Sequence, residues 1–79
     1  MKLLDWQFTR RRGIKAIFDE FPNSVVIFRL INHFYFVYTI DWSKDDRIVT
    51  KADLDKMGIL INRELGTEQG YLNRKSNSN

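Results

Sequence analysis

Four positive side chains near the N-terminus are the first candidates for chemistry in this sequence. Arg10, Arg11 and Arg12 are consecutive, and Lys15 follows closely. Guanidinium groups match the geometry of phosphate oxygens, so such a block is typical of nucleic-acid-binding surfaces. Aromatic residues of a sheet, such as Tyr35, could stack on bases in a single-strand binder. The alternatives are a solvated run of charge for the arginines and a core role for the aromatic rings.

A second candidate lies in the acidic segment that follows the aromatic run. Asp41, Ser43 and Asp45 have the spacing of the first three ligands of an EF-hand, and the segment resembles such a calcium-binding loop. Two positions depart from that pattern, because Asp46 replaces the glycine at the sixth position and Ala52 replaces the glutamate at the twelfth. We therefore expect a polar turn before a helix, with no metal and no cofactor.

Residues suited to catalysis are scarce in this chain. His33 is the single histidine, and there is no cysteine, which excludes disulfides and thiolate zinc sites. The acidic pairs 19–20 and 45–46 are adjacent, so their side chains diverge in a helix or strand and form no acid–base pair. We expect a protein that is not an enzyme.

Length and charge indicate one small domain with a macromolecular partner. A chain of 79 residues has a thin core, and its formal net charge of +3 is only mildly basic. The positive block near residue 10 and the acidic residues 41–55 make the chain dipolar, which suits steering toward a partner. No apolar run is long enough for a signal peptide or a membrane span, so we expect a cytoplasmic protein without a membrane partner.

The strongest structural signal is a pair of apolar runs, 25–31 and 34–42, separated by Asn32 and His33. Runs of β-branched and aromatic residues around a polar pair predict a β-hairpin. Neither run alternates cleanly between apolar and polar, so both faces of the hairpin carry apolar groups. One face must cover a core, and the other needs a partner. The register decides which residues stay exposed, and the sequence leaves it open.

The flanking segments predict helices and short strands. Residues 2–8 alternate like a strand, and apolar residues at helical spacing predict a helix over 10–21 that ends before Pro22. Its arginines at the start and acids at the end oppose the helix dipole. Residues 47–49 suggest a third strand. Thr50 and Asp53 form a capping box for a helix over 50–65, which stops at Gly66.

These elements predict an α+β domain over residues 1–66 and a flexible C-terminal tail over 67–79. The domain is a small antiparallel sheet of two to three strands, with an extra N-terminal edge strand, packed against two helices. The order helix–strand–strand–strand–helix resembles that of double-stranded-RNA-binding domains. That family carries a lysine-rich start of its last helix, whereas Lys51 here stands beside Asp53 and Asp55. We therefore do not assign the chain to that family.

An apolar and aromatic sheet face without a cover favours an interface with another protein. We expect a small non-catalytic regulator or inhibitor that binds a protein partner, of the accessory type found among phage and mobile-element products. A homodimer through the sheet is its simplest form. The expected interface residues are Tyr35, Val37, Ile27 and Arg29. The alternative is a nucleic-acid-binding protein that uses Arg10–Arg12 and Lys15.

Overall fold

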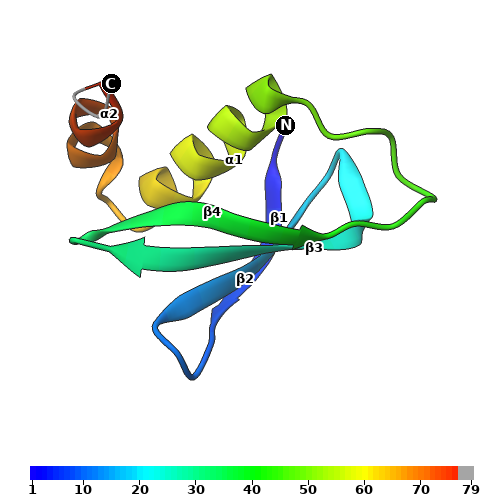
Figure 1. The fold of residues 1–79 in the computed structure, drawn as a ribbon, viewed down its shortest axis with the longest axis horizontal. Coiled ribbons are helices and arrows are strands. Elements are labelled where there is room, and N and C mark those ends of the chain that lie inside the picture. Colours follow the sequence, from blue (N-terminus) through cyan, green and yellow to red (C-terminus); the bar gives the residue numbers. More distant parts are fainter. Residues whose placement is uncertain (77–79) are drawn as a thin grey trace.

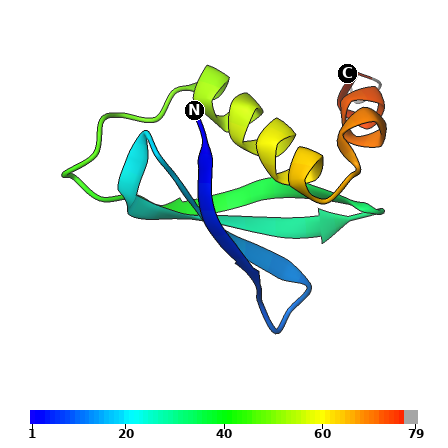
Figure 2. The same cartoon turned by 180° about the vertical axis from the view of Figure 1, so that it is seen from behind.

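The computed structural model describes residues 1–76 and contains one antiparallel sheet with two helices on one side of it. The elements are β1 (Leu3–Phe8), β2 (Gly13–Phe18), β3 (Phe21–Ile31), β4 (Phe34–Asp41), α1 (Lys51–Glu64) and α2 (Glu68–Ser76). Neighbouring strands are consecutive in the chain, in the order β1-β2-β3-β4. The β1–β2 hairpin projects away from the helices (Figure 1), as the view from behind also shows (Figure 2). The α+β class is confirmed, with four strands in place of two to three.

The segment predicted as a helix over residues 10–21 is instead the β1–β2 turn followed by strand β2. Ile14, Ala16 and Phe18 alternate on one face of β2 and are buried. The apolar residues of this segment fit both a helical repeat and strand alternation, and pairing with a strand on each side favours the strand. Because this segment is not a helix, its arginines and acidic residues do not oppose a helix dipole. The helix-first order that resembled double-stranded-RNA-binding domains is wrong for the same reason.

The core lies between α1 and the two central strands. Met57 and Ile61 of α1 are fully buried against the inner face of β2 and β3. Burial of this apolar surface is the main stabilising term of such a small domain. The buried sheet residues of the core are Ile14, Ala16, Phe18, Phe21, Val26 and Phe28.

The predicted hairpin of the two apolar runs is confirmed as β3 and β4. Asn32 and His33 form its two-residue turn, with φ values of 56° and 112°. Positive φ at both positions is the geometry that matches the twist of the strands. Thr39 pairs with Ile27 while Val37 pairs with Phe28, so β4 carries one extra residue at Tyr38. The turn sets the faces of residues 34–37, and this β-bulge changes the alternation for the residues of β4 after Val37.

Helix α1 begins and ends as the sequence predicts. The Thr50 hydroxyl accepts a hydrogen bond from the Asp53 N–H, and the Asp53 carboxylate accepts one from the Thr50 N–H. Gly66 follows the helix with φ 78°, a left-handed conformation that glycine adopts without strain. The predicted strand at 47–49 is wrong, because these residues belong to the loop between β4 and α1.

The C-terminal segment contains the second helix. Glu68–Ser76 forms α2, and its Tyr71 is buried against α1 at Gly58. The predicted division into a domain at 1–66 and a flexible tail at 67–79 stays a prediction. Residues 77–79 of that tail lie outside the described residues.

Candidate functional site

The candidate site begins at the free edge of strand β4. Within residues 1–76 this strand pairs only with β3, so the backbone groups on its other edge have no strand partner there. At Tyr35 the side chain of Asn62 takes the place of a strand. The Tyr35 N–H donates to Asn62 Oδ1 (3.2 Å), and Asn62 Nδ2 donates to the Tyr35 carbonyl (2.8 Å). The amide of Asn62 thus pairs with the edge as a peptide group would.

Two residues further on, the edge is open. Val37 directs its N–H and C=O to the same edge as Tyr35, because successive residues of a strand alternate. Among residues 1–76, no loop or side-chain hydrogen bond uses the Val37 backbone. An apolar groove of about 780 Å³ lies along this edge. The groove is lined by residues 36–40 of β4, Trp42, Ile48 and Val49 of the following loop, Leu54 of α1, and Tyr71 and Lys75 of α2.

Large apolar side chains at the groove are exposed to solvent. Ile48 is 77% exposed and Trp42 is 45% exposed. The indole Nε1 of Trp42 donates to the Arg47 carbonyl (3.0 Å), which fixes the ring against the loop. Exposed apolar groups around a concavity are typical of a site that binds another molecule.

A buried carboxylate holds the loop that forms one wall of the groove. Asp46 accepts hydrogen bonds from the Asn23 N–H (3.0 Å), Asn23 Nδ2 (3.0 Å) and Ser24 Oγ (2.6 Å). Burial alone raises the pKa of Asp46, but the bonds from Ser24 and Asn23 outweigh it and the pKa is lowered. The hydroxyl of Ser24 in turn accepts from the Ser43 N–H (2.9 Å). The loop is therefore tied to β3 before any partner binds.

An arginine secures the other end of the same loop. The guanidinium of Arg47 donates to both oxygens of Asp53 (2.8 and 3.0 Å) and to Glu20. It also lies over the ring of Phe21, 4.5 Å from its centroid. The hydrogen bonds from Arg47 and Thr50 hold the pKa of Asp53 far below its usual value. This network joins the β2–β3 turn, the loop and the start of α1.

The four residues predicted as an interface do not share one face. Tyr35 and Val37 face the helices, and Val37 lines the groove. Ile27 and Arg29 lie on the opposite face, where the Arg29 guanidinium stacks 3.5 Å from the centroid of Tyr38. The two-residue turn at Asn32 and His33 separates the two pairs, because it sets Tyr35 opposite Leu30 and Val37 opposite Phe28, which alternate with Ile27 and Arg29.

Three groove residues were not predicted from the sequence. Trp42 and Ile48 flank the polar residues 43–47, and this pattern could have indicated exposed apolar side chains at a binding site. The sequence gave no such indication for Tyr71, because the segment around it lacks an apolar repeat. This segment is held by contacts with α1 and β4, which are distant in the chain.

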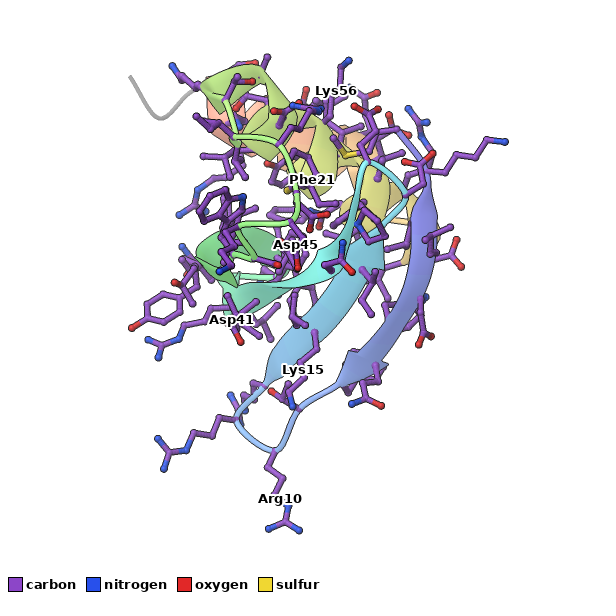
Figure 3. All side chains as sticks on the ribbon, turned by 90° about the vertical axis from the view of Figure 1, so that its right-hand side faces the viewer. Arg10, Lys15, Phe21, Asp41, Asp45 and Lys56 are labelled. Atoms are coloured by element: carbon purple, nitrogen blue, oxygen red, sulfur yellow. The ribbon has the colours of Figure 1, made fainter. Side chains whose placement is uncertain are left out.

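The predicted positive residues lie on the β1–β2 hairpin and not at the start of a helix. Arg10, Arg11 and Arg12 form the tip, and Lys15 is on β2. Figure 3 shows Arg10 at the far end of this hairpin, with Lys15 on the same hairpin and Lys56 of α1 at the opposite end of the molecule. The anion-binding donors of a helix N-terminus are therefore absent from this predicted site.

The acidic loop does not gather its side chains into a metal site. Asp41 ends β4, and the Asp45 N–H donates to Ser43 Oγ (3.2 Å). Within residues 1–76 there is no group of three or more histidine or acidic side chains placed to hold a metal ion. The neighbouring Asp46 serves the loop anchor described above.

The family of the chain follows from its similarity to known proteins. Of the two described helices, neither is long and apolar enough to cross a membrane. No curated protein and no solved structure matches the chain. A family model described as "Uncharacterised protein YuzH" matches residues 2–76. Because this match covers almost the whole chain, the protein belongs to the YuzH family.

Proposed function

We propose that this protein is a small non-catalytic module that binds a partner protein by taking up an extended apolar segment along the open edge of β4. The observation that carries the proposal is the apolar groove beside unpaired backbone groups at Val37. A peptide that adds to a sheet edge gains main-chain hydrogen bonds, and pockets beside the edge select its alternate side chains. The groove supplies both features.

The composition of β4 supports an edge that can pair with another strand. Proteins commonly protect a free edge with lysine or proline, which hinder pairing with another strand. Residues 34–41 contain neither, and their one charge is Asp41 at the end of the strand. The pairing of Asn62 with Tyr35 further supports the idea that this edge accepts an amide partner.

The regulatory or inhibitory role, the cytoplasmic location and the accessory-protein origin stay predictions from the sequence. Homodimerisation through the sheet is the main alternative occupant, since two β4 edges could pair with one another. We favour a partner segment because Trp42, Ile48 and Val49 of the loop and residues of α2 wall the groove beside the edge, which suits one extended chain more than a second complete sheet.

The test is selection of binding peptides from a random peptide library on the full chain, followed by amide chemical-shift mapping. We expect enriched peptides with aliphatic or aromatic side chains at alternate positions, and shift changes at residues 37–40 and 48. Trp42 fluorescence should change on titration with these peptides. Peptides that bind without perturbing these amides would contradict the proposal.

Two substitutions, Ile48→Lys and Val37→Pro, test peptide binding in a protein that stays folded, and a third serves as the control. Ile48→Lys places a charge on the most exposed apolar side chain and should weaken peptide binding at least tenfold. Leu4→Lys, at a 58% exposed position on the other edge strand, is the matched control and should leave binding unchanged. Val37→Pro removes an outward N–H but no ladder bond, so it should block binding in a folded protein. Concentration-dependent dimerisation that Val37→Pro abolishes, without peptide binding, would assign the edge to a second copy.

A further inference from the structure

The β1–β2 hairpin and the open face of the sheet carry more cations than acids, and Asp5 and Asp41 are the carboxylates that the register places on that face within residues 1–76. The positive groups in ion pairs among the described residues are the amino group of Met1 and the side chains of Arg47, Arg63 and Lys75. In contrast, five positive side chains of the hairpin and the adjoining strand take part in no ion pair within residues 1–76. These are Arg10, Arg11, Arg12, Lys15 and Arg29. The positive charge of this region is therefore free to meet an anionic partner.

Strand pairing brings these cations together from distant parts of the chain. Gly13 pairs with Arg29, and Lys15 pairs with Ile27, so Lys15 and Arg29 share the face turned away from the helices. The Arg12 carbonyl accepts a hydrogen bond from the Leu30 N–H (3.3 Å), which ties the tip to β3. Arg29 is further held by its stacking on Tyr38. A run of phosphates could follow this surface from the tip along the sheet.

The left-handed backbone conformation of Arg12 supports a functional role for its side chain. Arg12 has φ 57°, a left-handed conformation that glycine adopts without strain and side chains rarely adopt. Side chains held in such a conformation are concentrated at functional sites. The hairpin keeps an arginine at a position where glycine would serve the fold better.

An exposed aromatic ring lies directly before the arginine tip. Phe8 is 61% exposed and packs edge-on against Trp6, with ring centroids 5.1 Å apart. Tyr35 is the next ring, 6.4 Å from Phe8. A ring that is fixed by neighbours on one side and open on the other is a platform for an unpaired base.

We propose that the β1–β2 hairpin binds single-stranded nucleic acid that passes round its tip. A base stacks on Phe8, which pairs with the buried Ile14 and so lies on the helix side of the sheet, and the phosphates that follow meet the arginine tip and then Lys15 and Arg29 on the opposite face. Single strands are favoured over duplexes because only an unpaired base offers its face to a ring. None of the five cations lines the β4 groove, although Arg29 stacks on Tyr38, which does. This binding therefore goes beyond the proposed protein-binding function and does not depend on it.

The experiment measures fluorescence anisotropy of a labelled oligonucleotide of about 20 nucleotides with the full chain over a series of salt concentrations. Five phosphate contacts predict a log–log salt slope of about −3.5 for a single strand, and removal of three predicts about −1.4. The triple variant Arg10→Gln, Arg11→Gln, Arg12→Gln should show the smaller slope. Its matched control, Lys44→Gln, Lys51→Gln, Lys56→Gln, makes the same change in formal net charge and should keep the wild-type slope.

Phe8 variants separate base stacking from charge. Phe8→Leu keeps an apolar side chain without a stacking face and should weaken binding roughly fivefold or more, with the salt slope unchanged. Circular dichroism of each variant establishes that it is folded. Equal weakening by both triple variants, tighter binding of a duplex of the same length, or equal competition by poly-L-glutamate would each overturn the proposal.

Discussion

The amide of Asn62 offers the sharpest test of how the helices are fastened to the sheet. This fully buried side chain bonds to the Tyr35 N–H, the Tyr35 and Gly58 carbonyls, and the hydroxyl of Thr67. Asn62→Leu keeps a similar volume but removes all four hydrogen bonds. It also leaves the edge groups of Tyr35 without a protein partner.

The expected cost follows from opposing terms. Four hydrogen bonds at a net value of about 1 kcal/mol each are lost. The apolar leucine side chain recovers about 1.5 kcal/mol through burial. The free energy of unfolding should therefore fall by roughly 2–3 kcal/mol, which corresponds to a melting temperature lower by about 10–20 °C for a domain of this size.

Urea unfolding followed by circular dichroism measures this change, and hydrogen exchange of the Tyr35 amide locates it. Asn73→Leu is the matched control, because Asn73 is exposed on α2 and bonds only to Gln69 among the described residues. That control should change stability by less than about 0.5 kcal/mol. A similarly small loss in Asn62→Leu, or unchanged exchange at Tyr35, would refute the assigned role.

Three further predictions concern the second helix, the hairpin tip and acid stability. Gly58→Ala would make a Cβ clash with Tyr71 Oη, so we expect displacement of α2, seen as faster amide exchange there, and a net loss of about 1–3 kcal/mol in unfolding free energy. Arg12→Gly should raise the melting temperature by relieving the left-handed backbone, while it lowers oligonucleotide affinity; a lower melting temperature would count against the strain argument. The pKa of Asp53 is lower in the folded than in the unfolded state, so its stabilisation is present above about pH 4 and is lost as the pH falls further. Urea unfolding of Asp53→Asn should show lower stability at neutral pH and a shallower acid dependence, and an unchanged acid dependence would contradict the assignment.

Local signals were sufficient where the structure is decided by neighbouring residues. The capping box of Thr50 and Asp53 and the stop at Gly66 are contacts within a few residues, and the helix between them appears as predicted. The turn at Asn32 and His33 is likewise a local arrangement between two strand-forming runs.

Prediction failed where distant pairing decides the conformation. The segment 10–21 has an apolar pattern that suits a helix in isolation, and it becomes a strand because β1 and β3 supply hydrogen-bonding partners on both sides. The second helix is weakly amphipathic, and it is held by contacts of Tyr71 with Gly58 and Phe36 that form only in the folded chain.

From the sequence alone follow the α+β class, the β3–β4 hairpin, helix α1 and the residues of the positive block. Tertiary structure alone decided which faces and edges these residues occupy. The register set by the two-residue turn places Val37 opposite Phe28 on the helix side and leaves Ile27 on the open face, and strand pairing brings Arg29 beside the arginine tip. The physical reason is that side-chain identity sets local conformation, whereas a binding surface depends on register, and register is set by pairing between residues far apart in the chain.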